Sequence, residues 1–414
     1  MKIALLSTNH DLGGAAIVTR RLTDALRALG HDARMVVARP GSLSPDDPAV
    51  IAVDRLKWAV PFLAERADLF FRRGVSRKNL FKVSTGLTGL PLHSHPFVAE
   101  ADAVMVNWAS QGFLPLDSLE KIIATGKPVI YTMHDLWPAT SLCHLPEGCD
   151  RYADGSDCAL CPYLSKRAGK KFPAKLAAIK RRVFAADNLR LVAVSNWQRR
   201  LAEKSTILAG KEISVIPHPF PVDLYRPGEK SGPDGKRLIV MAAARLDDPV
   251  KDLPGAIAAL NTFAWEYPAD ASGVEVAFVG ALRDTSLLKS LRLPYTHHGL
   301  LTPGELRDIY SRATVVLSSS KYETMGATLM EGMASGAIPV TYGDAGQTDI
   351  VTDGINGFIA PVHTPASLAF ALSLALQTAR SDQEEDFTPA FLHNEVGRRF
   401  SPSTIASRYL SLIP

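Results

Sequence analysis

Two glutamates, Glu323 and Glu331, lie eight residues apart in the segment 318–336, which reads SSSKYETMGATLMEGMASG. An apolar run typical of a buried strand precedes the segment and another follows it, so a helix is expected between the two strands. Glu323 then lies on a strand-to-helix loop, with Thr324 or Thr328 expected to cap the helix. In open α/β sheets such loops hold ligands. Because carboxylates accept hydrogen bonds and repel anions, the pair favours sugar hydroxyls over phosphate; the alternative is two solvated surface charges.

Two cations in the same half of the chain, Arg245 and Lys251, follow a strand expected at residues 238–242. They lie on the loop RLDDPVKDLPG, which leads into a helix. Two cations at the end of a strand suit a diphosphate, because they stabilise the charge that develops when it leaves. The alternative is that they pair with the three aspartates of the same loop.

Two candidate acceptor or ligand segments also follow strands in the first half of the chain. His134 and Asp135 end the strand expected at residues 128–132. The histidine is expected to orient an acceptor hydroxyl or a leaving phosphate, and Asp135 to fix its tautomer. Gly13 and Gly14 follow the first strand, where they allow close approach of the backbone to a ligand; they lack the three-glycine spacing of an NAD site. The alternatives are a structural histidine and a tight turn without a ligand.

All four cysteines gather within nineteen residues, as Cys143, Cys149, Cys158 and Cys161. The C-x5-C-x8-C-x2-C spacing in a polar stretch predicts a structural zinc site, in which His144 is able to replace one ligand. Two disulfides or free thiols are the alternatives. No basic recognition helix follows inside the cysteine loop, so a nucleic-acid finger is not expected.

Residues 55–80 mix aromatic side chains such as Trp58 and Phe70 with many arginines and lysines at helical spacing. This pattern suits a helix that lies on an anionic membrane surface. An ordinary amphipathic helix packed on its own domain explains the same pattern, and Pro61 and Gly74 interrupt the periodicity.

Composition limits the class of protein. The 414 residues are 46% hydrophobic and 21% charged, with a net charge of +4, which is too weak to argue for nucleic-acid binding. No apolar run approaches the roughly 20 residues of a membrane span, and the first residues enter a strand rather than a signal peptide. A cytoplasmic location is therefore expected.

Strands and helices alternate along the chain, which predicts an α/β protein with two doubly wound domains. We expect a first domain at residues 1–216 with the Cys-rich insert 143–161, and a Pro- and Gly-rich linker at 217–236. A second domain follows at 237–395, and a final helix at 396–414 has no sheet partner.

The segment KYETMGATLMEGMASGAIPV, followed by DIVTDGINGFIA, resembles the signature of the retaining glycosyltransferases of family 4. That family has the GT-B architecture, in which two Rossmann-like domains face each other across a cleft. Arg245 and Lys251 match its basic pair, and Gly13 and Gly14 match its N-terminal glycine loop. The segment HHGLLTPGELRDIYSRATVVLSSS, which contains Gly299, also matches. Thr324 departs from the usual proline or glycine.

The resemblance implies a role for each matching residue of the second domain. Glu323 would contact hydroxyls of the donor sugar, and Glu331 would bind the ribose. Backbone N–H groups at Met325, Gly326 and Ala327 would hold sugar and phosphate.

The remaining matches complete the implied donor site and the acceptor side. Arg245 and Lys251 would take the diphosphate, and Gly13, Gly14 and Gly299 would border the donor. The acceptor would lie on the first domain, facing His134 and the Gly13 loop, and the final helix would cross back to that domain.

The function implied is transfer of a hexosyl group from a nucleoside diphosphate-sugar to a glycan or lipid-linked acceptor, with retention at the anomeric carbon and without a catalytic metal. A role in bacterial surface polysaccharide synthesis, such as lipopolysaccharide, follows, with peripheral contact at the inner face of the cell membrane through residues 55–80. A nucleotide-sugar epimerase or hydrolase of the same fold is one alternative. A non-catalytic, zinc-stabilised module that binds glycans or lipids is the other.

Overall fold

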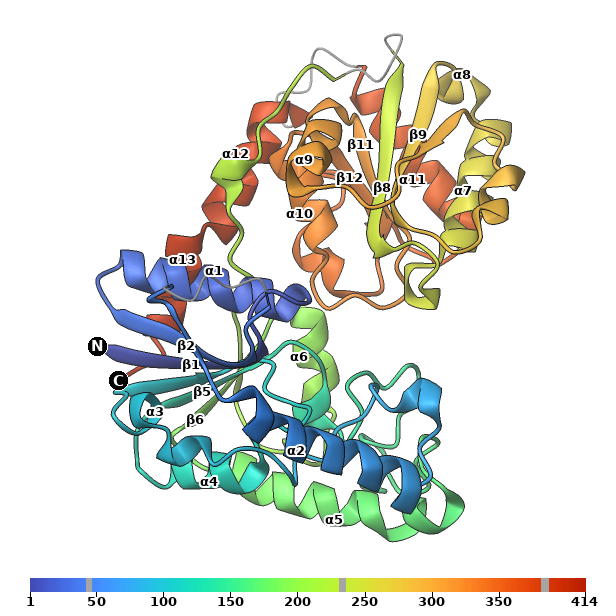
Figure 1. Ribbon diagram of the computed structural model, residues 1–414. Coiled ribbons are helices and arrows are strands. Elements are labelled where there is room, and N and C mark those ends of the chain that lie inside the picture. The colour runs from blue at the N-terminus through green and yellow to red at the C-terminus, as the bar shows by residue number, and fades with distance from the viewer. Residues whose placement is uncertain (42–46, 231–235, 381–386) are drawn as a thin grey trace. The chain divides into compact units, whose positions relative to one another are not determined.

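The computed structural model describes residues 1–41, 47–230, 236–380 and 387–414 (Figure 1). The chain divides into two compact units, one formed by Met1–Pro219 with Pro402–Pro414 and the other by Phe220–Ser401. Residues 231–235 of the linker expected from the sequence lie outside the described residues. Each unit is built on its own parallel sheet.

The first unit has a seven-stranded sheet in the order β3-β2-β1-β4-β5-β6-β7, and every described strand pairing in it is parallel. Its central strands are continuous aliphatic runs that are buried on both faces, as expected for a parallel sheet covered by helices. The strands are β1 (Lys2–Asn9), β2 (Asp32–Arg39), β3 (Val50–Ala52), β4 (Ala103–Val106), β5 (Val129–Met133), β6 (Leu189–Ala193) and β7 (Ile213–Val215).

Helices cover both faces of this sheet, with α1 and α13 on one face and α4 and α5 on the other (Figure 1). The last helix, α13, joins the core of the first unit through Ile405, Ala406 and Tyr409, and the Tyr409 hydroxyl lies 3.1 Å from Oγ1 of Thr132. The helices of this unit are α1 (Gly14–Ala28), α2 (Arg55–Ala67), α3 (Pro96–Ala99), α4 (Leu116–Ile123), α5 (Lys166–Phe184), α6 (Asn196–Glu203) and α13 (Pro402–Leu410).

The second unit has a six-stranded parallel sheet in the order β10-β9-β8-β11-β12-β13. Its strands are β8 (Arg237–Arg245), β9 (Val274–Ala281), β10 (Tyr295–His297), β11 (Val315–Ser318), β12 (Ile338–Tyr342) and β13 (Phe358–Ala360). Its helices are α7 (Leu253–Glu266), α8 (Pro268–Ala271), α9 (Pro303–Arg312), α10 (Ala327–Ala334), α11 (Pro365–Thr378) and α12 (Pro389–Phe400). In Figure 1, α9, α10 and α12 lie on one side of the sheet, and α7, α8 and α11 on the other.

The strand order reverses once in each sheet. In the first unit the chain leaves β1 toward β2 and β3 and then returns to place β4 on the other side of β1. In the second unit β11 returns in the same way to the free side of β8. Ligands of open α/β sheets bind beyond the carboxyl ends of the strands at such a reversal. The α/β class with two doubly wound sheets, predicted from the sequence, is confirmed.

The helix predicted after Glu323 is present as α10, but the expectation about its cap was wrong. Its N-cap is Gly326, which adopts the left-handed φ of 97°, and no side chain caps the helix. Thr324 and Thr328 therefore do not serve as N-caps. A glycine accepts this backbone conformation at little cost, and it leaves the first N–H groups of the helix without a side-chain acceptor.

Within the described ranges, no helix combines the length and the apolar character that crossing a bilayer requires.

Candidate functional site

The reversal point of the second sheet brings two of the predicted residues into contact. Lys251 ends the short helical turn Pro249–Lys251 after β8, and Glu323 lies on the loop after β11. Nζ of Lys251 lies 2.7 Å from Oε2 of Glu323, and the two side chains are 30% and 21% exposed. Residues 72 positions apart thus form one partly buried ion pair at the edge where ligands bind.

Arg245 is the last residue of β8 and does not join this pair. Its guanidinium lies 3.2 Å from Oδ1 of Asp247 and is 49% exposed. The alternative of local pairing therefore holds for Arg245, whereas Lys251 pairs with the distant Glu323.

Two loops are held in place around the ion pair. Ser319 Oγ donates to the carbonyl oxygens of Lys251, at 2.7 Å, and Asp252, at 3.2 Å. Gly346 N–H donates to the carbonyl of Glu323 at 2.8 Å. A Cβ at Gly346 would lie 2.0 Å from the carbonyl oxygen of Thr324, so only glycine fits between the two loops. These bonds fix the backbone on both sides of the pair.

The remaining residues expected at the donor lie around α10 and the end of β9. Met325 is buried, Ala327 begins α10, and Glu331 lies within that helix. Burial raises the pKa of Tyr310, and the nearby Glu331 carboxylate raises it further. The carbonyl of Gly299 accepts a hydrogen bond from the N–H of Gly280 at 2.7 Å.

Sequence reasoning missed His363, which follows β13, the last strand in the order of the second sheet. Its ring stacks on Tyr342 with 3.7 Å between ring centroids, and Nδ1 lies 3.0 Å from Oδ2 of Asp344. Nε2 lies 3.6 Å from Oδ2 of Asp252, the residue directly after Lys251. The only available signal was its place a few residues beyond a short apolar strand.

His134 lies beyond β5, close to the reversal point of the first sheet. Its Nε2 lies 3.1 Å from Oδ1 of Asn107, which directly follows β4, and its ring stacks on His218 at 5.4 Å. Burial lowers the pKa of His134 to about 4, so the imidazole is neutral at neutral pH. A neutral imidazole is able to accept one hydrogen bond from a hydroxyl or to donate one to it.

Asp135 does not fix the tautomer of His134, and that expectation was wrong. Its carboxylate instead accepts from Nε1 of Trp108 at 2.8 Å and lies 2.7 Å from Nδ1 of His144. Burial opposes the ionisation of Asp135, but the His144 imidazole and the N–H donors hold its pKa below the ordinary value. The chain turns after β5, so adjacent side chains point to different partners, and Asn107 takes the expected role.

His144 is not placed as a zinc ligand. Its Nδ1 faces Asp135, and its Nε2 lies 3.1 Å from Oγ of Ser84. Both ring nitrogens are therefore engaged away from the thiols, and the expectation that His144 replaces a cysteine was wrong.

The four cysteines are free thiols in this structure. Burial is the main cause that raises the pKa of Cys143 to about 12 and that of Cys161 to about 11, and the other thiols raise both further. Nη1 of Arg151 lies 3.6 Å from Sγ of Cys149. Over the described ranges, no group of three or more His, Cys, Asp or Glu side chains is arranged to hold a metal ion. The zinc site stays a prediction.

The glycine loop of the first unit is open. Gly13 has φ of 90° and precedes α1 as its N-cap, and no atom lies within 4 Å of a Cβ built on Gly13 or Gly14. The loop therefore has free space beside it, and its N–H groups begin a 15-residue helix.

Two family profiles together match most of the chain. The profile described as Glycosyltransferase Family 4 matches residues 12–224, and that described as Glycosyl transferases group 1 matches residues 229–389. The D-inositol 3-phosphate glycosyltransferase of Acidothermus cellulolyticus is 27% identical over 215 residues, which are 47% of this chain and 46% of that protein. The glycogen synthase of Chlamydia muridarum is 38% identical over 80 residues, 19% of this chain and 17% of that protein. The matches thus span less than half the length of these curated relatives.

Solved structures share the fold over almost the whole chain. HepE of Anabaena, crystallised in complex with UDP, has a TM-score of 0.62 at 16% identity and covers 99% of both chains. The sucrose-phosphate synthase of Thermosynechococcus elongatus has a TM-score of 0.62 at 18% identity, covering 99% of this chain and 97% of that one. These likenesses, with the two parallel sheets, confirm the predicted GT-B fold. The chain belongs to Glycosyltransferase Family 4.

Proposed function

We propose that this protein transfers a sugar from a nucleoside diphosphate-sugar to a hydroxyl of a glycan or lipid-linked acceptor, with retention at the anomeric carbon. The observation that carries the proposal is the Lys251–Glu323 ion pair at the reversal point of the second sheet. A cation and a carboxylate at that edge suit the two halves of such a donor, since the cation attracts the diphosphate and the carboxylate accepts from sugar hydroxyls.

In the proposed donor site, Lys251 leaves Glu323 for the diphosphate and Arg245 leaves Asp247 to join it. Glu323 is then free to accept hydrogen bonds from the sugar. The N–H groups at Met325, Gly326 and Ala327 hold sugar and phosphate, and Glu331 binds the ribose. Gly13, Gly14 and Gly299 border the donor. The left-handed Gly326 supports this arrangement because it leaves the α10 N-terminus uncapped.

In the proposed reaction the bond from the anomeric carbon to the diphosphate oxygen breaks, and a bond to the acceptor oxygen forms on the same face of the sugar. Lys251 and Arg245 stabilise the departing diphosphate, which takes the proton of the acceptor hydroxyl. Neutral His134 orients that hydroxyl. The reaction as written needs no catalytic metal, because the two cations neutralise the diphosphate.

The division of labour between the two halves is part of the proposal. Residues 1–216 bind the acceptor, and residues 237–395 bind the nucleotide-sugar. Synthesis of a bacterial surface polysaccharide is the proposed role, and a hexose is the proposed sugar. A structural zinc ion in the cysteine cluster is proposed on the spacing of the cysteines alone.

A melt screen with UDP, GDP and ADP, each alone and as its sugar conjugate, tests the donor part. We expect one nucleoside diphosphate to raise Tm and its sugar conjugate to raise it further. With that donor, Glu323→Ala should abolish transfer while the protein stays folded. Full activity in the variant would contradict the assignment. Rapid donor turnover without acceptor would favour a hydrolase or epimerase instead, and the anomeric configuration of the product tests retention.

A further inference from the structure

Helix α2 carries apolar side chains on its outer face. Leu56, Val60 and Leu63 are 79%, 70% and 62% exposed, and their spacing of four and three residues places them on one side of the helix. Phe71, in the helical continuation Asp68–Arg72, is 80% exposed. A helix on the surface of a protein ordinarily turns such a face toward the core. The α2 outer face, defined by these four residues, instead faces outward.

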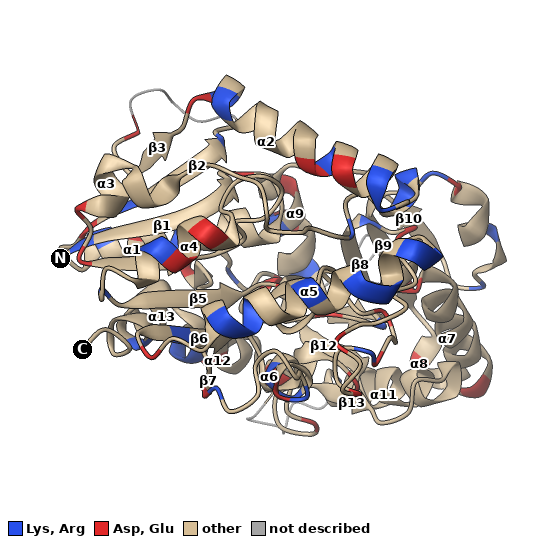
Figure 2. Ribbon diagram, turned by 90° about the horizontal axis from the view of Figure 1, so that it is seen from below, with Lys and Arg blue, Asp and Glu red and all other residues tan. Residues whose placement is uncertain are grey.

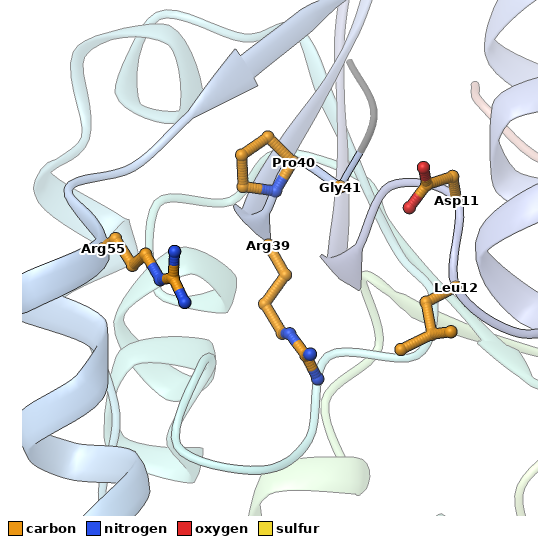
Figure 3. Close-up of a pocket in the computed structure, with 6 residues that line it drawn as sticks. All are labelled: Asp11, Leu12, Arg39, Pro40, Gly41 and Arg55. Atoms are coloured by element: carbon orange, nitrogen blue, oxygen red, sulfur yellow. The ribbon is translucent and has the colours of Figure 1, made fainter.

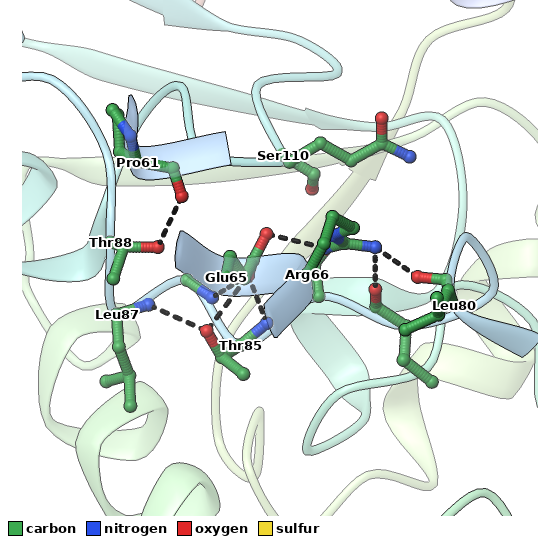
Figure 4. Close-up of polar contacts among 12 residues, drawn as sticks. Pro61, Glu65, Arg66, Leu80, Thr85, Leu87, Thr88 and Ser110 are labelled. Carbon is green, nitrogen blue, oxygen red and sulfur yellow. Dashed lines mark hydrogen bonds and ion pairs between the residues drawn. The ribbon is translucent and has the colours of Figure 1, made fainter. Parts of the chain in front are cut away.

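The inner face of α2 holds a buried ion pair (Figure 4). Glu65 accepts from the backbone N–H of Thr85 at 2.6 Å and from its hydroxyl at 2.9 Å, and it binds Nη2 of Arg66 at 2.6 Å. Nη1 of Arg66 donates to the carbonyls of Val83, at 3.1 Å, and Leu80. Rolling the helix to bury the outer face would strip these charges of their partners, which is strongly unfavourable. The outward orientation is therefore fixed by the inner face.

Basic side chains surround the α2 outer face. Arg55 and Lys57 lie in its first turn, and Arg72, Arg77 and Lys78 follow its end; all five are exposed. Figure 2 shows Lys and Arg in blue at both ends of this helix. Of the five, Arg72 alone forms an ion pair among the described residues, at 3.3 Å from Asp68. An apolar strip flanked by five cations, four of which form no ion pair with another described residue, matches the chemistry of an anionic bilayer surface.

A pocket with two arginines opens at the N-terminal end of α2 (Figure 3). It encloses about 310 Å³ and is lined by Asp11, Leu12, Arg39, Pro40, Gly41 and Arg55. Figure 3 shows the side chains of Arg39 and Arg55 extending into the same space, with Asp11 on the side of Gly41. Neither arginine forms an ion pair with another described residue. Asp11 and Leu12 directly precede the Gly13 loop, so the pocket lies at the end of the sheet proposed for the acceptor.

From these two features together, we infer that the first unit docks on an anionic bilayer through the α2 outer face and binds the phosphate of a lipid-linked acceptor between Arg39 and Arg55. Arginine suits this role because its planar fork donates two hydrogen bonds to one phosphate. The inference rests on the proposed glycosyl transfer and names its acceptor class. It explains why a helix with a fixed polar inner face keeps leucine and phenylalanine in water.

Vesicle co-sedimentation of the full chain tests the docking surface. We expect wild type to bind vesicles of phosphatidylglycerol and phosphatidylethanolamine at least tenfold more tightly than vesicles of phosphatidylcholine alone. The double variant Leu63→Glu with Phe71→Glu should lose at least tenfold in binding to the anionic vesicles, because each glutamate replaces a side chain that would enter the interface. The matched control is Trp265→Glu, which changes a side chain that is 74% exposed in the second unit and should leave binding unchanged. Equal binding by wild type to both vesicles, or full binding by the double variant, overturns the docking surface.

Binding of farnesyl diphosphate, compared with inorganic pyrophosphate, tests the pocket. The double variant Arg39→Gln with Arg55→Gln should bind farnesyl diphosphate about tenfold or more weakly, since two charge-assisted contacts are lost. Unchanged affinity overturns the pocket assignment. Wild type that binds both probes equally shows a phosphate site without a lipid preference, which overturns the lipid-linked acceptor.

The same variants keep this inference separate from the proposed function. Both double variants leave the second unit intact, so the rise in Tm with the nucleoside diphosphate should be unchanged in each. If no nucleoside diphosphate binds even to wild type, the proposed transfer fails whatever the vesicles show. If the nucleotide binds and the vesicles do not, only the docking inference fails.

Discussion

The Lys251–Glu323 ion pair predicts that nucleotide binding and sugar transfer respond in opposite directions to one substitution. Nζ of Lys251 lies 2.7 Å from the Glu323 carboxylate, so a diphosphate that binds Lys251 must first break this pair. Glu323→Gln keeps the shape of the side chain and removes its charge. We therefore expect the variant to bind the nucleoside diphosphate more tightly and to lose transfer.

The size of the gain follows from the exposure of the pair. Exposed ion pairs contribute about 0.2–1 kcal/mol, and hydrogen bonds between charged groups about 1.5–3 kcal/mol. The two side chains are 30% and 21% exposed, which places this pair near the lower of these ranges. A competing interaction of about 1 kcal/mol corresponds to about fivefold in affinity. The neutral amide of the variant is a weaker hydrogen-bond acceptor than a carboxylate, and removal of a hydrogen bond that stabilises a transition state lowers a rate by about 10²–10³, which is the upper limit for this variant.

Calorimetric titration of wild type and Glu323→Gln with the nucleoside diphosphate found in the melt screen measures the first effect, and initial rates with the sugar donor measure the second. Lys251→Met should weaken nucleotide binding, since it removes the cation itself. Asp117→Asn is the control, because it removes the charge of a carboxylate that pairs with a lysine in the first unit; Lys121 and Asp117 lie 2.8 Å apart and are more exposed, at 52% and 72%. Weaker nucleotide binding by Glu323→Gln would refute the reasoning, because the carboxylate would then assist the diphosphate rather than compete with it.

Three further predictions concern the loops, the histidine and the cysteines. Gly346→Ala should lower the free energy of unfolding by about 2–3 kcal/mol and abolish transfer, because its Cβ would meet the Thr324 loop. Gly354→Ala, which has open space beside it, should lower the free energy of unfolding by about 1 kcal/mol. Denaturant unfolding of the two variants measures both values. The folded-state pKa of His134 is about 4, below the ordinary 6.5. Between these pH values the unfolded state binds more protons than the folded state. The free energy of unfolding should therefore fall by about 3 kcal/mol as the pH drops through that window. His134→Gln should remove that part of the pH dependence in urea titrations, and an unchanged slope would contradict the burial of this ring. Elemental analysis should find one zinc per chain in wild type and none in Cys158→Ser; equal zinc in both contradicts the cluster.

The strand-to-helix loop that carries Glu323 was predictable because its signals are local. Two apolar runs on either side of a short helix define β11, α10 and β12, and parallel strands end at one edge. That edge also receives Lys251, so the meeting of the two residues follows from topology. The capping of α10 was not predictable in the same way. The loop before this helix is held by bonds such as that from the Gly346 N–H to the Glu323 carbonyl, which join segments with no common sequence pattern.

Asp135 shows what could not be predicted from the sequence in the first unit. A carboxylate next to a histidine in sequence predicts a bond between them, but the backbone turns after β5 and sends the side chains to different partners. Asn107 and His144, which take those positions, come from other loops. Spacing along the chain identifies the edge of the sheet, whereas the partner at that edge depends on how loops fold over it.

Helix α2 marks a different limit, because hydrophobic periodicity finds a face without telling which way it points. The sequence of residues 55–80 fits a helix packed on its own domain as well as one on a membrane. The buried Glu65–Arg66 pair shows which face points inward, since its partners at Thr85 and Val83 are reached only from the inner side. Two adjacent charged residues of opposite sign within an amphipathic helix are therefore a signal to use when the direction of its apolar face is inferred.

The Cys-rich segment is linked to the end of β5 by more than chain connectivity. His144, directly after Cys143, bonds Asp135, and the buried Lys180 of α5 donates to the carbonyls of Trp137 at 2.6 Å and Thr140 at 2.9 Å. The ammonium also lies 3.4 Å from the centroid of the Trp137 ring. The turn that carries His134 is thus held from both sides, by the segment and by α5. A change in the conformation of the cysteine cluster would therefore reach Asp135 through His144, and Asp135 directly follows the proposed acceptor histidine in the chain.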